Sequence, residues 1–338
     1  MNEYLVIGSG LSGAVIAREL AEHGNKVTIL EKRVDEIGGN LYDYMIDGIR
    51  IHKYGPHIWH TNSKSIHEWM DRFANFIDYE HKVQALHNNL YYKFPPDPNK
   101  WTPEEIVDIF YRPYTEKMWD KKLEDVSPDI LDRVRTQSNV YNDMYFPNDK
   151  YQGMPENGWT ETISKMIDHK NINIIFTKFD KSFNTKRYKK IFNSMSPDEY
   201  YSYKYGALGY RGLLFWTAKI PLYDLNIPTP TINFTANKED LPYTRMTEWK
   251  KYPGCGDNKF CTYITYEEPI AALSPISEKF YPINAEDDKK ILKKYKKLQK
   301  TEKNMIFIGR QGTYKYIDMD DAIKLALKIV KKEINEND

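Results

Sequence analysis

The sequence contains little cysteine: among 338 residues only Cys255 and Cys261 occur, separated by five residues. This spacing matches no metal-binding pattern, and two thiols in a chain of this size are typical of a reducing compartment. We therefore expect a cytoplasmic protein.

An excess of charge of one sign and long hydrophobic runs are also missing. The 49 Lys and Arg residues nearly balance the 48 Asp and Glu residues, which offers no electrostatic reason to bind nucleic acid or an acidic membrane. No apolar stretch is long enough to span a bilayer, and an apolar run begins close to Met1, so we expect neither a membrane segment nor a signal peptide. The sequence shows no Ser-His-Asp or Cys-His constellation and no cluster of metal ligands, so we expect no metal site.

A glycine-rich turn near the N-terminus is the first positive signal. Gly8-Ser9-Gly10-Leu11-Ser12-Gly13 follows an apolar run at 3–7 that predicts a strand. Residues 11–23 show helical periodicity, and residues 26–31 predict a second strand that ends at Glu31. This order predicts a dinucleotide-binding βαβ unit. The pyrophosphate would lie at the helix N-terminus, and Glu31 would accept hydrogen bonds from the adenosine ribose.

The residues after the second strand favour FAD over NAD. Glu31-Lys32-Arg33 and Ile37-Gly38-Gly39-Asn40 resemble the pattern of two-dinucleotide-binding flavoproteins. In that family the second glycine pair lies against the extended pyrophosphate and ribityl chain of the cofactor. The resemblance therefore implies bound FAD.

The rest of the chain is expected to leave this nucleotide-binding domain and then to return to it. The proline-rich stretch 94–99 fits neither a helix interior nor a central strand, which places a domain boundary there. The other predicted elements are a helix at 64–76, strands at 83–92 around an Asn88-Asn89 turn, short helices at 103–136, an antiparallel sheet at 172–235, a strand at 305–308 and a helix at 320–334.

We predict an α/β fold: a Rossmann-like FAD-binding domain with a small helical domain and an antiparallel-sheet substrate domain. The expected domains are 1–93, the first part of the FAD-binding domain; 94–150, a reduced helical domain; 151–300, a mixed and largely antiparallel substrate domain; and 301–338, the return to the FAD-binding domain.

Further segments, in the same order along nearly the whole chain, are similar to those of bacterial UDP-galactopyranose mutases. They are residues 52–62, 114–119, 151–155, 205–211, 232–235, 242–245, 280–284, 309–310, 314–316 and 318–319. The chain is thus identified as a member of this family with a shortened second domain.

The resemblance implies an isomerase that interconverts UDP-galactopyranose and UDP-galactofuranose for cell-surface glycan biosynthesis. In this family the N5 atom of reduced FAD attacks the anomeric carbon while UDP leaves, with no net redox change. The resemblance also implies a UDP-sugar substrate, NAD(P)H or another reductant for the flavin, and a homodimer. Neither a nucleic acid nor a membrane is expected as a partner.

The resemblance assigns roles to individual residues. Arg245 and Arg211 match arginines that grip the diphosphate, which suits permanently charged guanidinium groups. His57 matches the histidine facing the flavin, and histidine is easily tuned near neutral pH. The predicted catalytic residues are His57, Arg245, Arg211, Tyr281 and Tyr316. The predicted cofactor-binding residues are Gly8, Gly10, Leu11, Ser12, Gly13, Glu31, Lys32, Gly38, Gly39, Asn40, His57, Arg310, Asp318 and Met319. The predicted substrate-binding residues are Phe110, Tyr111, Tyr114, Thr115, Trp119, Tyr151, Asn233, Arg211, Arg245, Tyr281 and Tyr316.

Each assignment competes with a structural explanation. The arginines could form surface salt bridges, Phe110 could lie on a helix face packed into the core, and the tyrosines could be hydrogen-bonded core residues. A structural role is the stronger explanation for His52 and His60.

Three features depart from the family pattern. The segment 94–114 is several dozen residues shorter, in a region that contributes to the family's dimer contact, which leaves the oligomeric state open. The diphosphate-binding arginine expected near 136–139 is missing, and Arg133 and Arg135 are the only candidates nearby. The family's Gly-Pro-Ile-Asp turn is replaced by Met195-Ser196-Pro197-Asp198.

These departures leave three alternatives. The chain could catalyse the same chemistry on another nucleotide sugar, could be an FAD-dependent oxidoreductase of the amine-oxidase type, or could be a flavin-binding relative without catalysis. The segments 114–119 and 242–245 argue against an oxidase, which does not need to bind a diphosphate.

Overall fold

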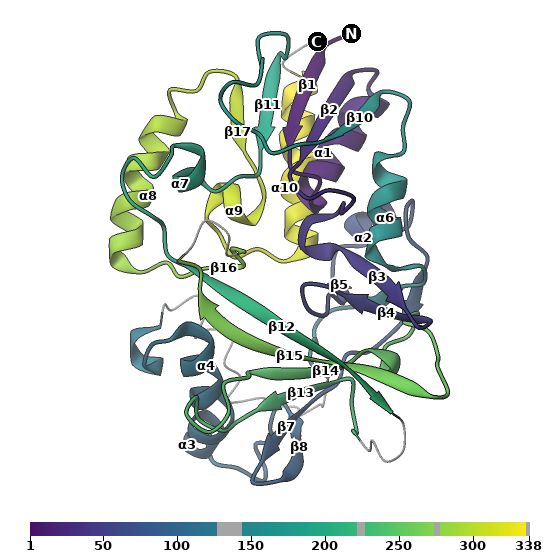
Figure 1. Ribbon diagram of the computed structural model, residues 1–338, viewed down its shortest axis with the longest axis vertical. Coiled ribbons are helices and arrows are strands. Elements are labelled where there is room, and N and C mark those ends of the chain that lie inside the picture. Colours follow the sequence, from purple (N-terminus) through teal and green to yellow (C-terminus); the bar gives the residue numbers. More distant parts are fainter. Residues whose placement is uncertain (127–143, 222–226, 274–277, 336–338) are drawn as a thin grey trace.

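Two large sheets organise the chain. The computed structural model describes residues 1–126, 144–221, 227–273 and 278–335. A parallel sheet lies next to both chain termini, and a larger mixed sheet lies at the opposite end of the molecule (Figure 1). The predicted α/β class, with one parallel and one largely antiparallel sheet, is confirmed.

The parallel sheet has the strand order β10-β2-β1-β11-β17. Its strands are β1 (Glu3–Ile7), β2 (Lys26–Glu31), β10 (Ile172–Phe176), β11 (Lys190–Asn193) and β17 (Met305–Phe307). Side chains of β1 alternate between two cores, as the pleat requires. Tyr4 and Val6 pack with α1 (Leu11–Glu22), α6 (Gly158–Ile167) and α10 (Met319–Asn335), whereas Leu5 and Ile7 pack with Tyr188 on the other face.

The position of β10 and β11 corrects one prediction. The whole stretch 172–235 was expected in the antiparallel sheet, but β10 pairs in parallel with β2, and β11 pairs in parallel with β1 and β17. The expected substrate segment 151–300 therefore includes strands of the nucleotide-binding sheet. A short apolar run predicts a strand but does not identify its neighbour, because pairing depends on contacts distant in sequence.

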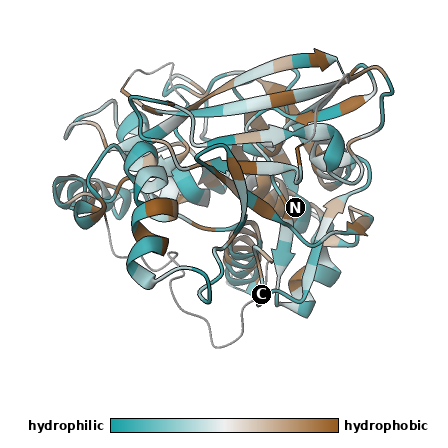
Figure 2. Ribbon diagram, turned by 90° about the horizontal axis from the view of Figure 1, so that it is seen from below, coloured by the Kyte–Doolittle hydropathy of each residue, from teal (hydrophilic) through white to brown (hydrophobic). Residues whose placement is uncertain are grey.

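The second sheet has the order β16-β12-β15-β14-β13-β7-β8. The strands are β7 (Val83–His87), β8 (Leu90–Phe94), β12 (Tyr210–Pro221), β13 (Thr231–Phe234), β14 (Arg245–Glu248), β15 (Cys261–Ala271) and β16 (Tyr281–Pro282). All neighbours pair antiparallel except β13 with β7. Hydrophobic and hydrophilic residues alternate along its long strands (Figure 2). The predicted hairpin is confirmed, since Asn88 and Asn89 have φ of 48° and 63°, as a tight turn requires.

Smaller elements join the two sheets. The structure contains a hairpin of β3 (Asp43–Ile46) and β4 (Ile49–His52), and a sheet of β5 (Trp59–Thr61), β9 (Tyr151–Pro155) and β6 (Phe76–Asp78). The helix predicted at 64–76 is shorter: α2 (Lys64–Met70) ends where the chain turns toward β6. The remaining helices are η1 (Gly39–Leu41), α3 (Pro103–Glu105), η2 (Ile106–Tyr111), α4 (Arg112–Trp119), η3 (Leu123–Asp125), α7 (Pro197–Tyr200), η4 (Trp249–Lys251), α8 (Glu286–Gln299) and α9 (Gly309–Thr313).

The helix α10 closes the parallel sheet beside α1, as the closing amphipathic helix was expected to do. Within the part of the chain that the structure describes, no helix combines the length and the apolar composition needed to cross a membrane.

Candidate active site

A cavity open to solvent lies at the carboxyl ends of the parallel strands. It encloses about 1280 Å³, including its open mouth. This dinucleotide cavity is lined by every residue that the sequence predicted to bind the cofactor, namely Gly8, Gly10, Leu11, Ser12, Gly13, Glu31, Lys32, Gly38, Gly39, Asn40, His57, Arg310, Asp318 and Met319. Its location agrees with the rule that ligands of parallel sheets bind beyond the carboxyl ends of the strands.

The glycine turn forms one wall of the cavity through close backbone packing. Gly8 has φ of +97°, and a Cβ atom on Gly13 would lie 2.1 Å from the carbonyl oxygen of Gly8. A side chain at either position would displace the turn. Gly10 is the N-cap of α1 and provides no side-chain cap, so the first N–H groups of the helix are available to an anion such as a pyrophosphate.

Glu31 lines the cavity and accepts hydrogen bonds from residues of the neighbouring loops. Its Oε2 accepts hydrogen bonds from the N–H group of Ser9 at 2.9 Å and from Ser9 Oγ at 2.6 Å, and its Oε1 accepts one from the N–H group of Arg33 at 2.9 Å. A carboxylate oxygen can accept more than one hydrogen bond. Glu31 therefore orders the glycine turn, and its contact with a ribose stays a prediction.

His57 lines the cavity and is held rigidly. Its N–H group donates to His52 Nδ1 at 3.2 Å, its carbonyl oxygen accepts from Trp159 Nε1 at 2.8 Å, and its Nδ1 lies 2.8 Å from the carbonyl oxygen of Gly55. A carbonyl oxygen only accepts, so Nδ1 carries the hydrogen and Nε2 is an acceptor. Burial lowers the pKa of His57 to about 3. The free protein thus holds this ring neutral at neutral pH.

A second group of site residues surrounds Arg245 on β14. Arg245 Nη2 donates to the Tyr114 hydroxyl at 3.1 Å, and Nε donates to Asn233 Oδ1 at 3.4 Å. Glu267 Oε1 lies 4.0 Å from Nη1. This Arg245 cluster, comprising Arg245, Tyr114, Asn233 and Glu267, joins α4 to three neighbouring strands (Figure 1). The side chain of Arg245 is 21% exposed, so its guanidinium can reach a ligand while water is mostly excluded.

Aromatic rings connect the Arg245 cluster with the dinucleotide cavity. Tyr281 and Tyr316 stack with ring centroids 5.2 Å apart, and Trp119 meets Tyr281 edge-on at 6.2 Å. The Arg310 guanidinium, which lines the cavity, lies 5.3 Å and 4.8 Å from the centroids of Tyr281 and Tyr316. Tyr281 also packs in the same hydrophobic cluster as Tyr114 of the Arg245 cluster, so the predicted catalytic tyrosines lie between the two sites.

Arg211 does not reach the Arg245 cluster in this structure. Its Nε donates to the carbonyl oxygen of Met118 at 2.7 Å, and its Nη2 donates to that of Lys117 at 3.3 Å. The guanidinium thus satisfies carbonyl groups at the C-terminus of α4, a position that favours a cation. Its geometry supports a role in holding α4 and not the predicted direct grip on a diphosphate.

Other predicted substrate residues also lie apart from the cluster. Phe110 and Tyr111 are 1% and 8% exposed and pack in a core with Val83 and Ala85. Tyr151 contacts the ring of His67 on α2 at 4.3 Å and lines a different hollow. Thr115, on α4, is buried. The direction of each of these side chains depends on the face of the helix or strand that carries it. The sequence motif alone does not show which face points toward the Arg245 cluster. Arg133 and Arg135 lie outside the described residues.

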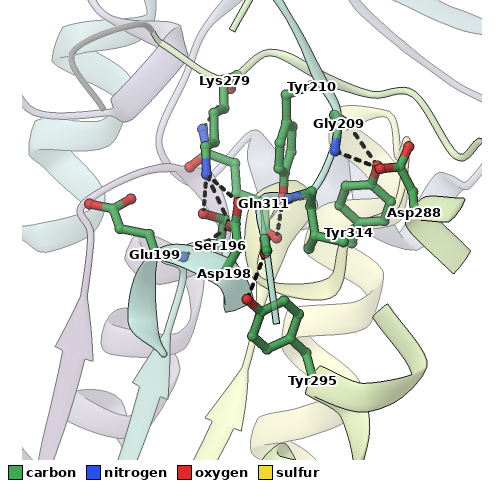
Figure 3. Close-up of polar contacts among 12 residues, drawn as sticks. Ser196, Asp198, Glu199, Gly209, Tyr210, Lys279, Asp288, Tyr295, Gln311 and Tyr314 are labelled. Carbon is green, nitrogen blue, oxygen red and sulfur yellow. Dashed lines mark hydrogen bonds and ion pairs between the residues drawn. The ribbon is translucent and has the colours of Figure 1, made fainter. Parts of the chain in front are cut away.

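A polar network anchors the two sheets to each other beside the cavity (Figure 3). Lys279 Nζ donates to Ser196 Oγ at 2.8 Å and to both carboxylate oxygens of Asp198 at 3.0 Å. Gln311 Nε2 donates to the Lys279 carbonyl oxygen, and the Tyr210 hydroxyl donates to the Gln311 carbonyl oxygen. The segment that replaces the family's Gly-Pro-Ile-Asp turn is therefore part of a buried joint, and Met195 has no left-handed backbone conformation.

The sequence analysis gave no role to three charged residues of these sites, the buried Glu267 and Lys117 and the mostly buried Lys279. Glu267 and Lys117 are 5% and 2% exposed, and the Lys279 side chain is 10% exposed. A partial signal existed for Glu267, because its position in β15 alternates with outward-facing residues and a charge on the inner face of a strand is unusual. Lys117 lies within the segment 114–119 that resembles the family, but the sequence does not reveal the burial of Lys117 or Lys279, since lysine is ordinarily a surface residue.

Two family descriptions match the chain. Residues 109–316 match the family described as UDP-galactopyranose mutase, and residues 6–73 match the NAD(P)-binding Rossmann-like domain. A probable UDP-galactopyranose mutase of Klebsiella pneumoniae is 32% identical, over 96% of this chain and 92% of its own. A dTDP-fucopyranose mutase of Escherichia coli is 31% identical over 100% of both chains.

Solved structures show the same fold. A crystal structure of reduced UDP-galactopyranose mutase superimposes with a TM-score of 0.73 at 13% identity, covering 99% of this chain and 94% of that one. A putrescine oxidase variant superimposes with a TM-score of 0.57 at 10% identity, covering 99% of each chain. At these identities the likeness establishes the fold alone.

Proposed function

Since this chain belongs to the UDP-galactopyranose mutase family, we propose that it is a flavin-dependent mutase that interconverts UDP-galactopyranose and UDP-galactofuranose. The observation that carries the proposal is the Arg245 cluster, which lies next to the dinucleotide cavity with the Tyr281–Tyr316 stack between them. A half-buried cation beside a cofactor site suits a nucleotide sugar, whose diphosphate is the leaving group.

FAD is the proposed cofactor. The fit is supported by the closely packed glycine turn, by the uncapped N-terminus of α1, and by Glu31 at the end of β2. The N-terminus of α10, at Met319, lines the same cavity and would favour negative charge on the bound group. When bound and reduced by NAD(P)H or another reductant, FAD supplies the nucleophile for the anomeric carbon.

The chain's own residues would bind and orient the substrate. Arg245 would pair with the diphosphate and stabilise the charge that develops as the nucleoside diphosphate departs. Tyr114, already hydrogen-bonded to Arg245, would lie against the nucleotide. Tyr281 and Tyr316 would exclude water from the sugar between the two sites. The neutral Nε2 of His57 would accept a hydrogen bond at the cofactor face of the sugar site.

A second substrate, dTDP-fucopyranose, is favoured by one observation. The dTDP-fucopyranose mutase relative matches over the full length of both chains at nearly the same identity as the UDP-galactopyranose mutase relative. Both substrates present a pyrimidine nucleoside diphosphate, so the Arg245 cluster serves either of them equally.

The test is an interconversion assay with a panel of nucleotide sugars. Purified protein is loaded with FAD, reduced with dithionite under nitrogen, and incubated with UDP-galactofuranose, UDP-galactopyranose or dTDP-fucopyranose. Chromatography should show ring interconversion with reduced protein and none with oxidised protein. Conversion of dTDP-fucopyranose alone would reassign the substrate. No conversion of any nucleotide sugar, with steady oxygen consumption on an amine, would instead establish the oxidoreductase alternative.

A further inference from the structure

Lys117, on α4, is a buried cation whose partners are all neutral. It is 2% exposed, and its Nζ donates to the carbonyl oxygens of Tyr243 at 2.8 Å, Phe234 at 3.1 Å and Leu241 at 3.4 Å. Among the described residues, no carboxylate lies within ion-pairing distance of this ammonium group. Burial alone lowers the pKa of Lys117 to about 8.

Such an arrangement is costly for stability. Moving an ammonium group out of water carries a large desolvation penalty, and neutral carbonyl oxygens offset less of it than a carboxylate would. An apolar side chain of similar length would avoid the penalty of burying a charge, but it would remove the three hydrogen bonds to the carbonyl oxygens. We therefore look for the role of Lys117 in the segments that its three hydrogen bonds hold in place, and not in a gain of stability.

The three carbonyl groups belong to the last residue of β13 and to the connection that leads from β13 to β14, which lies beside α4 (Figure 1). Phe234 is the last residue of β13, and Tyr243 lies two residues before Arg245. Both strands that flank the connection supply the Arg245 cluster: Asn233 from β13 and Arg245 from β14. One ammonium group thus fixes both ends of the connection.

The same helix presents the other half of the cluster. Tyr114 and Lys117 are three residues apart in α4 and so share one face of the helix. Tyr114 accepts the hydrogen bond from Arg245, while Lys117 binds the backbone that carries Arg245. Arg211 holds the carbonyl oxygens of Lys117 and Met118 from β12. The helix is therefore fixed at Lys117 from two directions.

We propose that Lys117 is a positioning residue that sets the separation between Tyr114 and Arg245, and thereby the affinity of the site for a pyrimidine nucleoside diphosphate. This inference rests on the proposed function, because it takes the Arg245 cluster as the nucleotide site. It adds a residue that touches neither substrate nor cofactor and acts through the backbone of the β13–β14 connection.

The chain provides a matched control for a test. Lys238, in the same connection, forms an ion pair of 2.7 Å with Asp120, the residue that follows α4. Like Lys117, Lys238 links the β13–β14 connection to α4. Its side chain is 53% exposed, so its ion pair should contribute little to holding the two together. The variants are Lys117→Met, which keeps the length and removes the charge and donors, and Lys238→Met. Lys117→Gln, which keeps an N–H donor, replaces Lys117→Met if that variant does not fold.

The measurements use full-length protein with FAD bound. Calorimetry gives the dissociation constant for UDP, and the flavin spectrum and FAD affinity report on the cofactor site. Because a small displacement of binding groups strongly weakens their action, Lys117→Met should raise the UDP dissociation constant about tenfold or more. KM should rise by a larger factor than kcat falls, and FAD affinity should not change. Lys238→Met should bind UDP like the unmodified protein.

The outcomes separate the inference from the proposed function. Unchanged UDP affinity in Lys117→Met overturns the inference, as does equal weakening in Lys117→Met and Lys238→Met, which would indicate a general effect of docking α4. If the unmodified protein itself binds neither UDP nor dTDP, the proposed function fails and the inference fails with it. A selective loss of UDP affinity in Lys117→Met supports both.

Discussion

Replacement of Arg245 by alanine is the most informative perturbation of the site. The guanidinium donates to the Tyr114 hydroxyl and to Asn233 Oδ1 and lies 4.0 Å from Glu267 Oε1. Its remaining N–H groups have no hydrogen-bond acceptor among the described residues and can face a diphosphate. Arg245→Ala removes these donors and the positive charge together.

The structure indicates two separate costs. The first is functional: loss of one donor to developing charge reduces the rate about a hundredfold or more, or about 3 kcal/mol. The second concerns folding, because Glu267 is 5% exposed and loses its only nearby cation among the described residues. Burial already raises the pKa of Glu267, while Arg245 opposes this rise, so the carboxyl group can be protonated in the variant. A stability loss of about 1–3 kcal/mol is therefore expected.

A double variant separates the two costs. Arg245→Ala/Glu267→Gln removes the unpaired carboxylate, so unfolding in urea should show most of the lost stability restored. UDP affinity, measured by calorimetry, should remain about a hundredfold or more below that of the unmodified protein in both variants. If Arg245→Ala keeps the original UDP affinity, or if Glu267→Gln restores it in the double variant, Arg245 does not bind the diphosphate and the reasoning is refuted.

Three other predictions follow from the geometry. Gly13→Ala should prevent stable FAD binding, measured as flavin content after purification, because the new Cβ atom would lie 2.1 Å from the carbonyl oxygen of Gly8. Burial lowers the pKa of His81 from 6.5 to about 3, so the unfolded chain takes up this proton first and stability falls as pH drops below 6.5, by about 2 kcal/mol at pH 5. The Tm of His81→Phe should therefore fall less between pH 7 and pH 5 than that of the unmodified protein. Lys279→Met should lower the free energy of unfolding by about 3 kcal/mol because it leaves Asp198 buried without its cation, and Lys279→Met/Asp198→Asn should recover part of the loss in urea denaturation; equal stability of the two variants would contradict this.

The glycine turn and the elements around it could be read from the sequence alone. Gly8, Gly13 and Glu31 act over short distances along the chain, through backbone conformation, close packing and the end of a neighbouring strand. Such local requirements restrict the residue type strongly and leave a recognisable spacing. The hairpin at Asn88 and Asn89 was predictable for the same reason, because its left-handed conformations favour asparagine.

Only the tertiary structure decided how the strands were divided between the sheets and which side chains met at the site. Residues 172–176 are an apolar run that would suit either sheet, and the pairing of β10 with β2 assigned it. The motif around Tyr114 left open whether Phe110 binds substrate or packs into a core, and the structure places Phe110 in a core and Tyr114 against Arg245. The sequence does not distinguish Lys117 from a surface lysine, and only the contacts with the β13–β14 connection show that it is buried. In each case the deciding interaction joins residues far apart in sequence, where a residue's type does not specify its neighbours.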